Sequence, residues 1–178
     1  MDISRNLLRL QGGDDGKLRY RLAMQGFTDV ADEDLPAVAL GLRLSPAVCL
    51  LGVALGTALT SPIVIGVLIP FAAVGFLTPY SPFDRLYNRF IRRWTGGPPL
   101  PPRRAPSRFA CAVATVWLAL ILTAFLTDHP TAGVALGGAM VLVAALMTFG
   151  HYCIASHLYR QLRGWPAHER PPPSQGHG

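Results

Sequence analysis

Three cysteines and one of the histidines are the residues of this chain whose types and positions could support chemistry. Cys49 lies near the start of the first apolar stretch, Cys111 near the start of the third, and Cys153 near the end of the fourth. His157 follows Cys153 by four residues, so both lie on one face if that segment is helical. Thiolate and imidazole groups bind zinc and copper, and thiols can form redox centres.

The same four residues also fit a role without any ligand. A buried cysteine behaves as a small apolar side chain, and the cytoplasmic side of a membrane keeps thiols reduced. The three cysteines are singletons without C-x-x-C spacing. We therefore predict free, buried or half-buried thiols with no disulfide, no metal and no cofactor. A site for a metal, thiol or sulfur species, formed by Cys49, Cys111, Cys153 and His157, stays open as the alternative.

Other sequence signatures of catalysis are absent from the chain. It contains no phosphate-binding glycine loop, no nucleophile elbow and no H-E-x-x-H zinc motif. The interiors of the apolar stretches contain no Lys, Arg, Asp or Glu, which disfavours a proton relay or an ion pathway. We therefore predict a non-enzymatic protein without catalytic residues, and we disfavour a transporter for the same reason.

Four apolar stretches must position these residues: 44–60, 62–80, 108–127 and 131–159. None of the 16 Lys and Arg residues lies in the short gaps that follow the first and third stretches. Basic residues stay on the cytoplasmic side during membrane insertion. The pattern predicts an all-α, four-helix integral membrane bundle with both termini in the cytoplasm, located in the inner membrane of a bacterium.

The spans divide the chain into three predicted parts. Residues 1–43 form a cytoplasmic N-terminal segment, residues 44–160 the membrane domain, and residues 161–178 a disordered cytoplasmic tail. Two short helices, over 17–26 and 28–40, or a flexible arm would both fit the N-terminal segment.

The first span is the shortest. Residues 46–60 would make a helix of about 22 Å, which is below the ~30 Å of a bilayer hydrocarbon core. The span therefore either begins further back in the chain or forms a hairpin that does not fully cross.

The central connection contains a predicted interfacial helix over residues 82–94. Ser81, Pro82 and Asp84 match an N-cap, a first-turn proline and an acidic partner at the third position. Aromatic and apolar residues recur along one face and arginines along the other, as in helices that lie in a membrane interface. The residues predicted to contact lipid are Phe83, Tyr87, Phe90, Trp94, Arg85, Arg89, Arg92 and Arg93. With the net charge of +6, this helix predicts binding to anionic headgroups and not to nucleic acid.

The segment after this helix is predicted to be extended. A pair of glycines ends the helix, and the proline-rich residues 98–102 favour a polyproline conformation. This run is expected to form a stiff strap across the cytoplasmic mouth of the bundle. Arg103, Arg104 and Arg108 are then expected to return to the lipid headgroups.

Two pairs of small residues predict close helix packing. Gly52 and Gly56 lie four residues apart in the first span, and Gly133 and Gly137 lie four apart in the fourth. Such pairs let helix backbones approach closely in lipid. They fit packing within the bundle or packing against a helix of a partner protein.

Several of these segments resemble a bacterial multi-span membrane family known only as domain of unknown function 4395. The resemblance rests on residues 45–49, 81–88, 98–102, 108–111 and 152–156. It covers about three quarters of the chain and implies a small multi-span protein with no established activity. Many relatives carry C-x-x-C near the end of the last span. Here Ser156 occupies the second position, so a dithiol pair of that kind is absent.

These observations predict a small structural membrane protein. We expect an accessory or assembly subunit that packs against the transmembrane helices of a larger energy-transducing or transport complex and binds membrane lipids. The rival prediction is a membrane protein that handles a metal, thiol or sulfur species through its cytoplasmic-side layer of cysteines.

Overall fold

The computed structural model describes residues 16–150 and 152–164, and this part of the chain is all-α without a β-strand. Residues 16–24 form an N-terminal helix. The elements that follow are η1 (Asp32–Asp34), α2 (Leu35–Leu42), α3 (Leu44–Ala58), α4 (Pro62–Leu77), α5 (Pro82–Leu86), the π-helical η2 (Tyr87–Ile91), α6 (Arg92–Thr95), α7 (Ala105–Leu126), α8 (Pro130–Gly150) and α9 (Ile154–Arg163).

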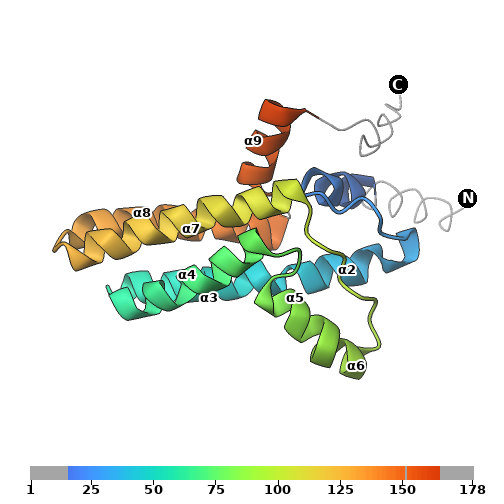
Figure 1. Cartoon of the computed structure of the whole chain (residues 1–178), viewed down its shortest axis with the longest axis horizontal. Helices are drawn as coiled ribbons and strands as arrows, with labels where there is room; N and C mark the ends of the chain where they lie inside the picture. The colour runs from blue at the N-terminus through green and yellow to red at the C-terminus, as the bar shows by residue number, and fades with distance from the viewer. Residues whose placement is uncertain (1–15, 151, 165–178) are drawn as a thin grey trace, which may run out of the picture.

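Four of these helices form an up-and-down bundle. Helix α3 packs against α4, α4 against α7, α7 against α8, and α8 against α3, so the chain order is also the order around the bundle (Figure 1). The centre of the bundle contains Val53, Ile65, Leu118 and Ile121, which are fully buried. This arrangement brings the start of α3, the end of α4, the start of α7 and the end of α8 to the same end.

The bundle helices have the length and apolarity of membrane spans. Three segments are each long and apolar enough to cross a membrane: Asp32–Ala58, Ala105–Leu126 and Pro130–Gly150. A fourth span is possible if α4 and the helix Pro82–Trp94, which meet at a bend of 79°, are counted together as one broken span. Helix α4 alone has 16 residues, or about 24 Å, which is short of the ~30 Å core. The chain is therefore a multi-pass membrane protein with three or four candidate spans.

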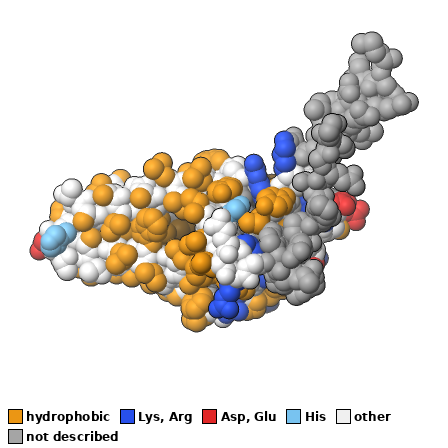
Figure 2. Space-filling view, turned by 90° about the horizontal axis from the view of Figure 1, so that it is seen from above, with side chains coloured by type: hydrophobic (Ala, Val, Ile, Leu, Met, Phe, Trp, Pro, Cys, Tyr) orange, Lys and Arg blue, Asp and Glu red, His pale blue; other side chains and the backbone are white. Residues whose placement is uncertain are grey.

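Charged side chains are segregated along the bundle. Figure 2 shows Lys and Arg atoms at one end of an apolar body, with Asp and His atoms at the opposite tip. That tip contains the turns after α3 and α7, where Thr60 and Asp128 have positive φ. We refer to the other end, where the Lys and Arg residues lie, as the charged end. The segregation agrees with the predicted up-and-down order, while the sidedness of the termini stays a prediction.

The first span begins further back than residue 44. Helices α2 and α3 are separated only by Arg43, and Pro46 lies in the first turn of α3, where a proline is tolerated. The continuous segment Asp32–Ala58 has 27 residues. The first span is therefore longer than residues 46–60 alone and is long enough for the hydrocarbon core.

The end of the fourth span differs from the prediction. Helix α8 ends at Gly150, and residues 154–159 belong to the separate helix α9, which leaves the bundle (Figure 1). Ser156 and Arg160 are buried because they bond to other segments: Ser156 Oγ lies 3.3 Å from the Pro106 carbonyl, and Arg160 Nη2 lies 3.2 Å from the Ala23 carbonyl. These polar anchors turn the chain away from the span.

Helices lie in both of the predicted segments that flank the membrane domain. Helix α9 continues to Arg163, past the predicted start of the tail at residue 161. Residues 165–178 of that tail and residues 1–15 lie outside the described residues. The described part of the N-terminal segment is helical at residues 16–24 and 32–42.

A second hydrophobic core lies at the charged end. It joins the N-terminal helix, α2, η2 and the strap, through Leu22, Phe27, Leu35, Val38, Ala39, Leu42, Tyr87 and Leu100. Asn88 holds the strap in place: its side chain accepts from the Leu100 amide at 2.8 Å and donates to the Leu100 carbonyl at 3.3 Å. The predicted strap therefore belongs to a small packed layer outside the bundle.

Candidate cysteine-lined cavity

A cavity of about 330 Å³ extends from the charged end into the bundle. Its walls come from α3, α4, α7 and α8, and the starts of α5 and α9 close part of its outer end. The lining is mostly apolar and includes the aromatic rings of Phe71, Phe83 and Trp117. Phe71 and Phe83 are stacked with 5.6 Å between ring centroids. The cavity therefore resembles a small-molecule site in size and lining, at the lower end of the ~300–1,000 Å³ range of such sites.

All three cysteines line this cavity. Cys49 comes from α3, Cys111 from α7, and Cys153 from the irregular residue that caps α9. The thiols are free. Cys153 is buried and the other two are half-buried, which is the predicted burial. Two of the four methionines, Met140 and Met147 of α8, line the same cavity. The up-and-down order explains the convergence, because each cysteine lies near the charged end of its segment.

His157 does not join the cysteines. Its Nδ1 lies 3.0 Å from the Cys153 carbonyl oxygen, and its ring packs on Tyr152 with 4.2 Å between centroids. Within residues 16–150 and 152–164, no three His, Cys, Asp or Glu side chains are placed to hold one metal ion. Of the four residues considered as a metal or sulfur site from the sequence, the three cysteines therefore line one cavity and the histidine lies apart from them.

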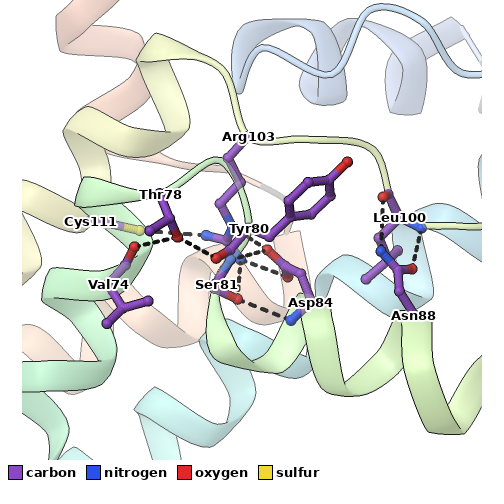
Figure 3. Close-up of polar contacts among 9 residues, drawn as sticks. All are labelled: Val74, Thr78, Tyr80, Ser81, Asp84, Asn88, Leu100, Arg103 and Cys111. Atoms are coloured by element: carbon purple, nitrogen blue, oxygen red, sulfur yellow. Dashed lines mark hydrogen bonds and ion pairs between the residues drawn. The ribbon is translucent and has the colours of Figure 1, made fainter.

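A buried ion pair lies beside the cavity (Figure 3). Arg103 binds Asp84 through two bonds, from Nε to Oδ2 at 2.6 Å and from Nη2 to Oδ1 at 3.0 Å. Asp84 is 1% exposed and Arg103 is 7% exposed. Asp84 also accepts from the Ser81 amide, and Ser81 Oγ accepts from the Asp84 amide, which confirms the predicted capping of α5. The pair thus joins the start of α5 to the residues just before α7.

The position of Arg103 corrects the sequence prediction. This side chain was expected at the lipid headgroups, but it points inward because Asp84 compensates its charge. One signal in the sequence was available: Asp84 is the only acidic residue between Asp34 and Asp128, so it needs a basic partner if it is buried. Arg104 instead pairs with Asp29. Arg108 donates to the Phe76 carbonyl at 2.8 Å, at the end of α4.

Arg103 brings a permanent positive charge to one cavity thiol. Its Nη1 lies 3.5 Å from Cys111 Sγ, and among the described residues this nitrogen donates only to that sulfur. Burial lowers the pKa of Arg103, but the hydrogen bonds and charge of Asp84 outweigh burial and raise that pKa above its ordinary value. The guanidinium is therefore charged at any physiological pH. A nearby cation favours the thiolate, the reactive form of cysteine, while burial favours the neutral thiol.

Backbone shape gives Cys111 its place. A Cβ added to Gly75 of α4 would lie 3.0 Å from Cys111 Sγ, so the glycine leaves the space that the sulfur uses. Ser107 lies one turn before Cys111 on the same face of α7 and also lines the cavity. Ser107 is 3% exposed. The polar end of the cavity therefore offers a hydroxyl and a guanidinium N–H.

The predicted lipid-facing stripe divides into two sets. Phe83 lines the cavity, and Tyr87 is buried in the second core, where we had predicted lipid contact for both. Phe90 and Trp94 are 57% and 93% exposed. The arginines of this helix are all exposed: Arg85, Arg89, Arg92 and Arg93. The π-helical turn of η2 adds a residue to the helical repeat, which rotates Phe90 away from Tyr87.

The four predicted packing glycines all face neighbours within the chain. A Cβ at Gly52 would lie 2.8 Å from Leu68, and one at Gly56 would lie 2.7 Å from Ile65. A Cβ at Gly133 would overlap the Phe125 ring, and one at Gly137 would overlap the Thr57 side chain. These contacts hold α3 to α4 and α8 to its two neighbours. The glycines therefore account for internal packing and need no partner helix.

Comparisons with known proteins give one match. The family described as "Domain of unknown function (DUF4395)" matches residues 39–164. No curated protein and no solved structure matches the chain. The matched range includes the four bundle helices, the ion pair and the three cysteines.

Proposed function

Because the chain belongs to the DUF4395 family, which is defined only as a domain of unknown function, we propose a function from its own cavity. The protein carries out thiol or sulfur chemistry at the membrane, and Cys111 is its reactive thiol. The observation that carries this proposal is the convergence of three cysteines from separate segments on one cavity, with a charged arginine touching one of them.

The arginine contact distinguishes this proposal from a role of the cysteines as small apolar side chains. Cysteines that only fill space need no charged neighbour, and a charge inside a bundle is expensive to bury. Here the guanidinium is held by Asp84 with one N–H group directed at the sulfur. The sulfurs of Met140 and Met147 add a soft, polarisable wall on α8, the helix next to α7.

Cys111 should react with a small electrophile faster than Cys49 in the same molecule. Both thiols are half-buried and line the same cavity, but only Cys111 touches a guanidinium. We expect labelling by N-ethylmaleimide in mild detergent to be about tenfold faster at Cys111. A tenfold difference in rate corresponds to ~1.4 kcal/mol of stabilisation of the thiolate by Arg103. Two unit charges 4 Å apart at an effective dielectric constant of 20 interact by ~4 kcal/mol, so the contact is strong enough. Peptide mass spectrometry over time gives both rates from one sample.

The comparison of Cys111 with Cys49 also defines the result that would contradict the proposal. Access to the cavity is shared, so a general change in opening alters both rates together. If Cys49 is labelled as fast as Cys111 or faster, the arginine does not activate the thiol and Cys111 is not the reactive group.

An accessory or assembly role is the second candidate. Helix α9 leaves the bundle and carries a row of apolar side chains, Ile154, Leu158 and Leu162, which are 44%, 46% and 73% exposed. Ile154 and Leu158 also line the cavity, so Leu162 is the member of the row that lies outside it. An apolar row of this spacing can pack on a helix of a larger membrane complex. The glycine pairs do not add to this candidate, because their contacts lie within the chain.

The second candidate predicts a partner that depends on α9. If a complex subunit binds the apolar row, Leu162→Ala should reduce the amount of that protein recovered with the bundle in mild detergent by about fivefold, as for a contact of ~1 kcal/mol. Leu126→Ala is the matched control, since Leu126 is 65% exposed at the other end of the bundle. Equal recovery with both variants would remove the support for α9 as a docking helix.

We also propose a bacterial inner-membrane location with both termini and the cavity end in the cytoplasm. The support is the concentration of Lys and Arg at the charged end and the positive-inside rule. In this orientation Phe90 and Trp94 enter the inner interface, and Arg85, Arg89, Arg92 and Arg93 face anionic headgroups, each contributing about 1 kcal/mol.

A further inference from the structure

We infer that the cavity binds a lipid-phase quinone and that Cys111 and Cys153 reduce it. This inference rests on the proposed function, because it takes Cys111 as the reactive thiol and names the molecule that accepts its electrons. It combines the cavity lining, the hydrogen-bond donors at one end and the position of a second thiol.

The lining selects a largely apolar ligand with one polar part. Almost all of the cavity wall is apolar, and its polar side chains lie at the charged end: Ser45, Ser81, Arg103 and Ser107. The cavity lies inside helices that have the composition of membrane spans. A ligand of this kind reaches the site more readily from the bilayer than from water. A quinone with an isoprenoid or alkyl tail is such a ligand, since it combines a long apolar tail with one polar ring.

Two donors are placed for the carbonyl oxygen of such a ring. Ser107 is buried and lines the cavity, and Arg103 Nη1 donates to the weak acceptor Cys111 Sγ at 3.5 Å. Both lie at the same thiol, since Ser107 and Cys111 are one turn apart on α7. A carbonyl oxygen between them would accept from the hydroxyl and the guanidinium. The rings of Phe71 and Phe83 and the indole of Trp117 supply flat surfaces for the quinone ring.

A dithiol and a quinone form a balanced pair of reactants. Two S–H bonds break and one S–S bond forms, so the thiols lose two electrons and two protons. The quinone takes both electrons, its two carbonyl oxygens take both protons, and the product is a hydroquinone. No further acid, base or oxidant is required. This agrees with α3, α4 and α8, which contain no Asp, Glu, Lys or Arg.

Cys153 is the better second thiol because its backbone can move. Cys49 lies within the continuous helix α3, whereas Cys153 is the extended residue before α9, with φ −100° and ψ 103°. A disulfide needs about 2.05 Å between sulfurs and a Cα separation of roughly 4.4–6.8 Å. An irregular segment can adjust to these distances at lower cost than the middle of a helix.

The test uses the reduced full-length protein in mild detergent without oxygen, with decylubiquinone as the probe. We expect one molecule of quinol to form per protein, with loss of two thiols and a Cys111–Cys153 disulfide in the peptide map of the unaltered protein. Cys111→Ser should abolish quinol formation. Ser107→Ala should weaken quinone binding by about threefold to tenfold, the effect of one hydrogen bond. Thr123→Ala is the control, because it removes an exposed hydroxyl from the same helix.

The outcomes separate this inference from the proposed function. If Cys111 reacts rapidly with maleimide but the quinone neither protects it nor is reduced, the quinone inference is wrong and Cys111 remains the reactive thiol. Protection of Cys111 without loss of thiols, or equal protection by decanol, would also overturn the inference, since the cavity would then hold any amphiphile. If Cys111 is unreactive toward maleimide and quinone alike, both proposals fail.

Discussion

Replacing Gly137 by alanine should destabilise the bundle by about 2–3 kcal/mol, because the added methyl group overpacks a close helix contact. Its Cβ would overlap the Thr57 hydroxyl and lie 2.7 Å from the Thr57 methyl group. Thr57 is buried on α3, so it cannot move aside into lipid. The expected result is a fall in the melting temperature, measured in one detergent, of roughly 5–10 °C at ~2–4 °C per kcal/mol.

The neighbouring residue provides the matched control. A Cβ at Gly138 meets no atom within 4 Å, so Gly138→Ala should have no steric cost and should raise helix propensity. A second variant tests the contact itself. The Thr57 hydroxyl has no hydrogen-bond partner among the described residues, so Thr57→Ala sacrifices no such bond and should partly rescue Gly137→Ala. Equal melting temperatures for the two glycine variants would show that α3 and α8 are not in close contact at Gly137.

Removing the Arg103 side chain should cost about 3–5 kcal/mol, because Asp84 would remain buried without its counter-charge. Arg103→Met keeps much of the apolar volume and removes the bonds to Asp84 at 2.6 and 3.0 Å. The same variant leaves Ser81 and Cys111 without the guanidinium N–H groups that contact them. We expect a large fall in the melting temperature in detergent and a smaller fraction of protein that elutes as a single species.

Arg104→Met is the control for this prediction. Arg104 pairs with Asp29, whose side chain is 72% exposed, and exposed pairs contribute only about 0–1 kcal/mol. A double variant, Asp84→Asn with Arg103→Met, should be less destabilised than Arg103→Met alone, since no unpaired charge remains. If the variants at Arg103 and Arg104 have equally small effects, the buried pair is not a major contributor to the fold.

Arg103 connects these stability predictions to the proposed thiol chemistry. Arg103 holds α5 to α7 and also directs an N–H group at Cys111, so its removal alters stability and thiol reactivity together. For this reason the comparison of Cys111 with Cys49 in the unaltered protein is the cleaner test of reactivity. The stability variants then report on all the bonds of Arg103, those to Asp84, Ser81 and Cys111.

Local patterns in the sequence determined the membrane character and much of the helix layout. Apolar length marks the spans, because each helix must present apolar side chains along the whole thickness of a bilayer. The distribution of Lys and Arg predicts which helix ends lie together. The capping of α5 by Ser81 and Asp84 is confirmed because it involves residues three apart in the chain. These features depend on composition and short spacing, which are visible without a fold.

Only the tertiary structure decided what the helices enclose. Asp84 and Arg103 are 19 residues apart, and their pairing depends on where the strap enters α7. Tyr87 packs into the second hydrophobic core, and the π-helical turn that begins at Tyr87 rotates Phe90 away from it. Helix α9 separates from α8 because Ser156 and Arg160 bond to segments 50 and 137 residues away in sequence. The up-and-down order predicted from the sequence already places the three cysteines at one end of the bundle. That they line one cavity depends on how α3, α7 and the α9 cap pack together, which no local pattern encodes.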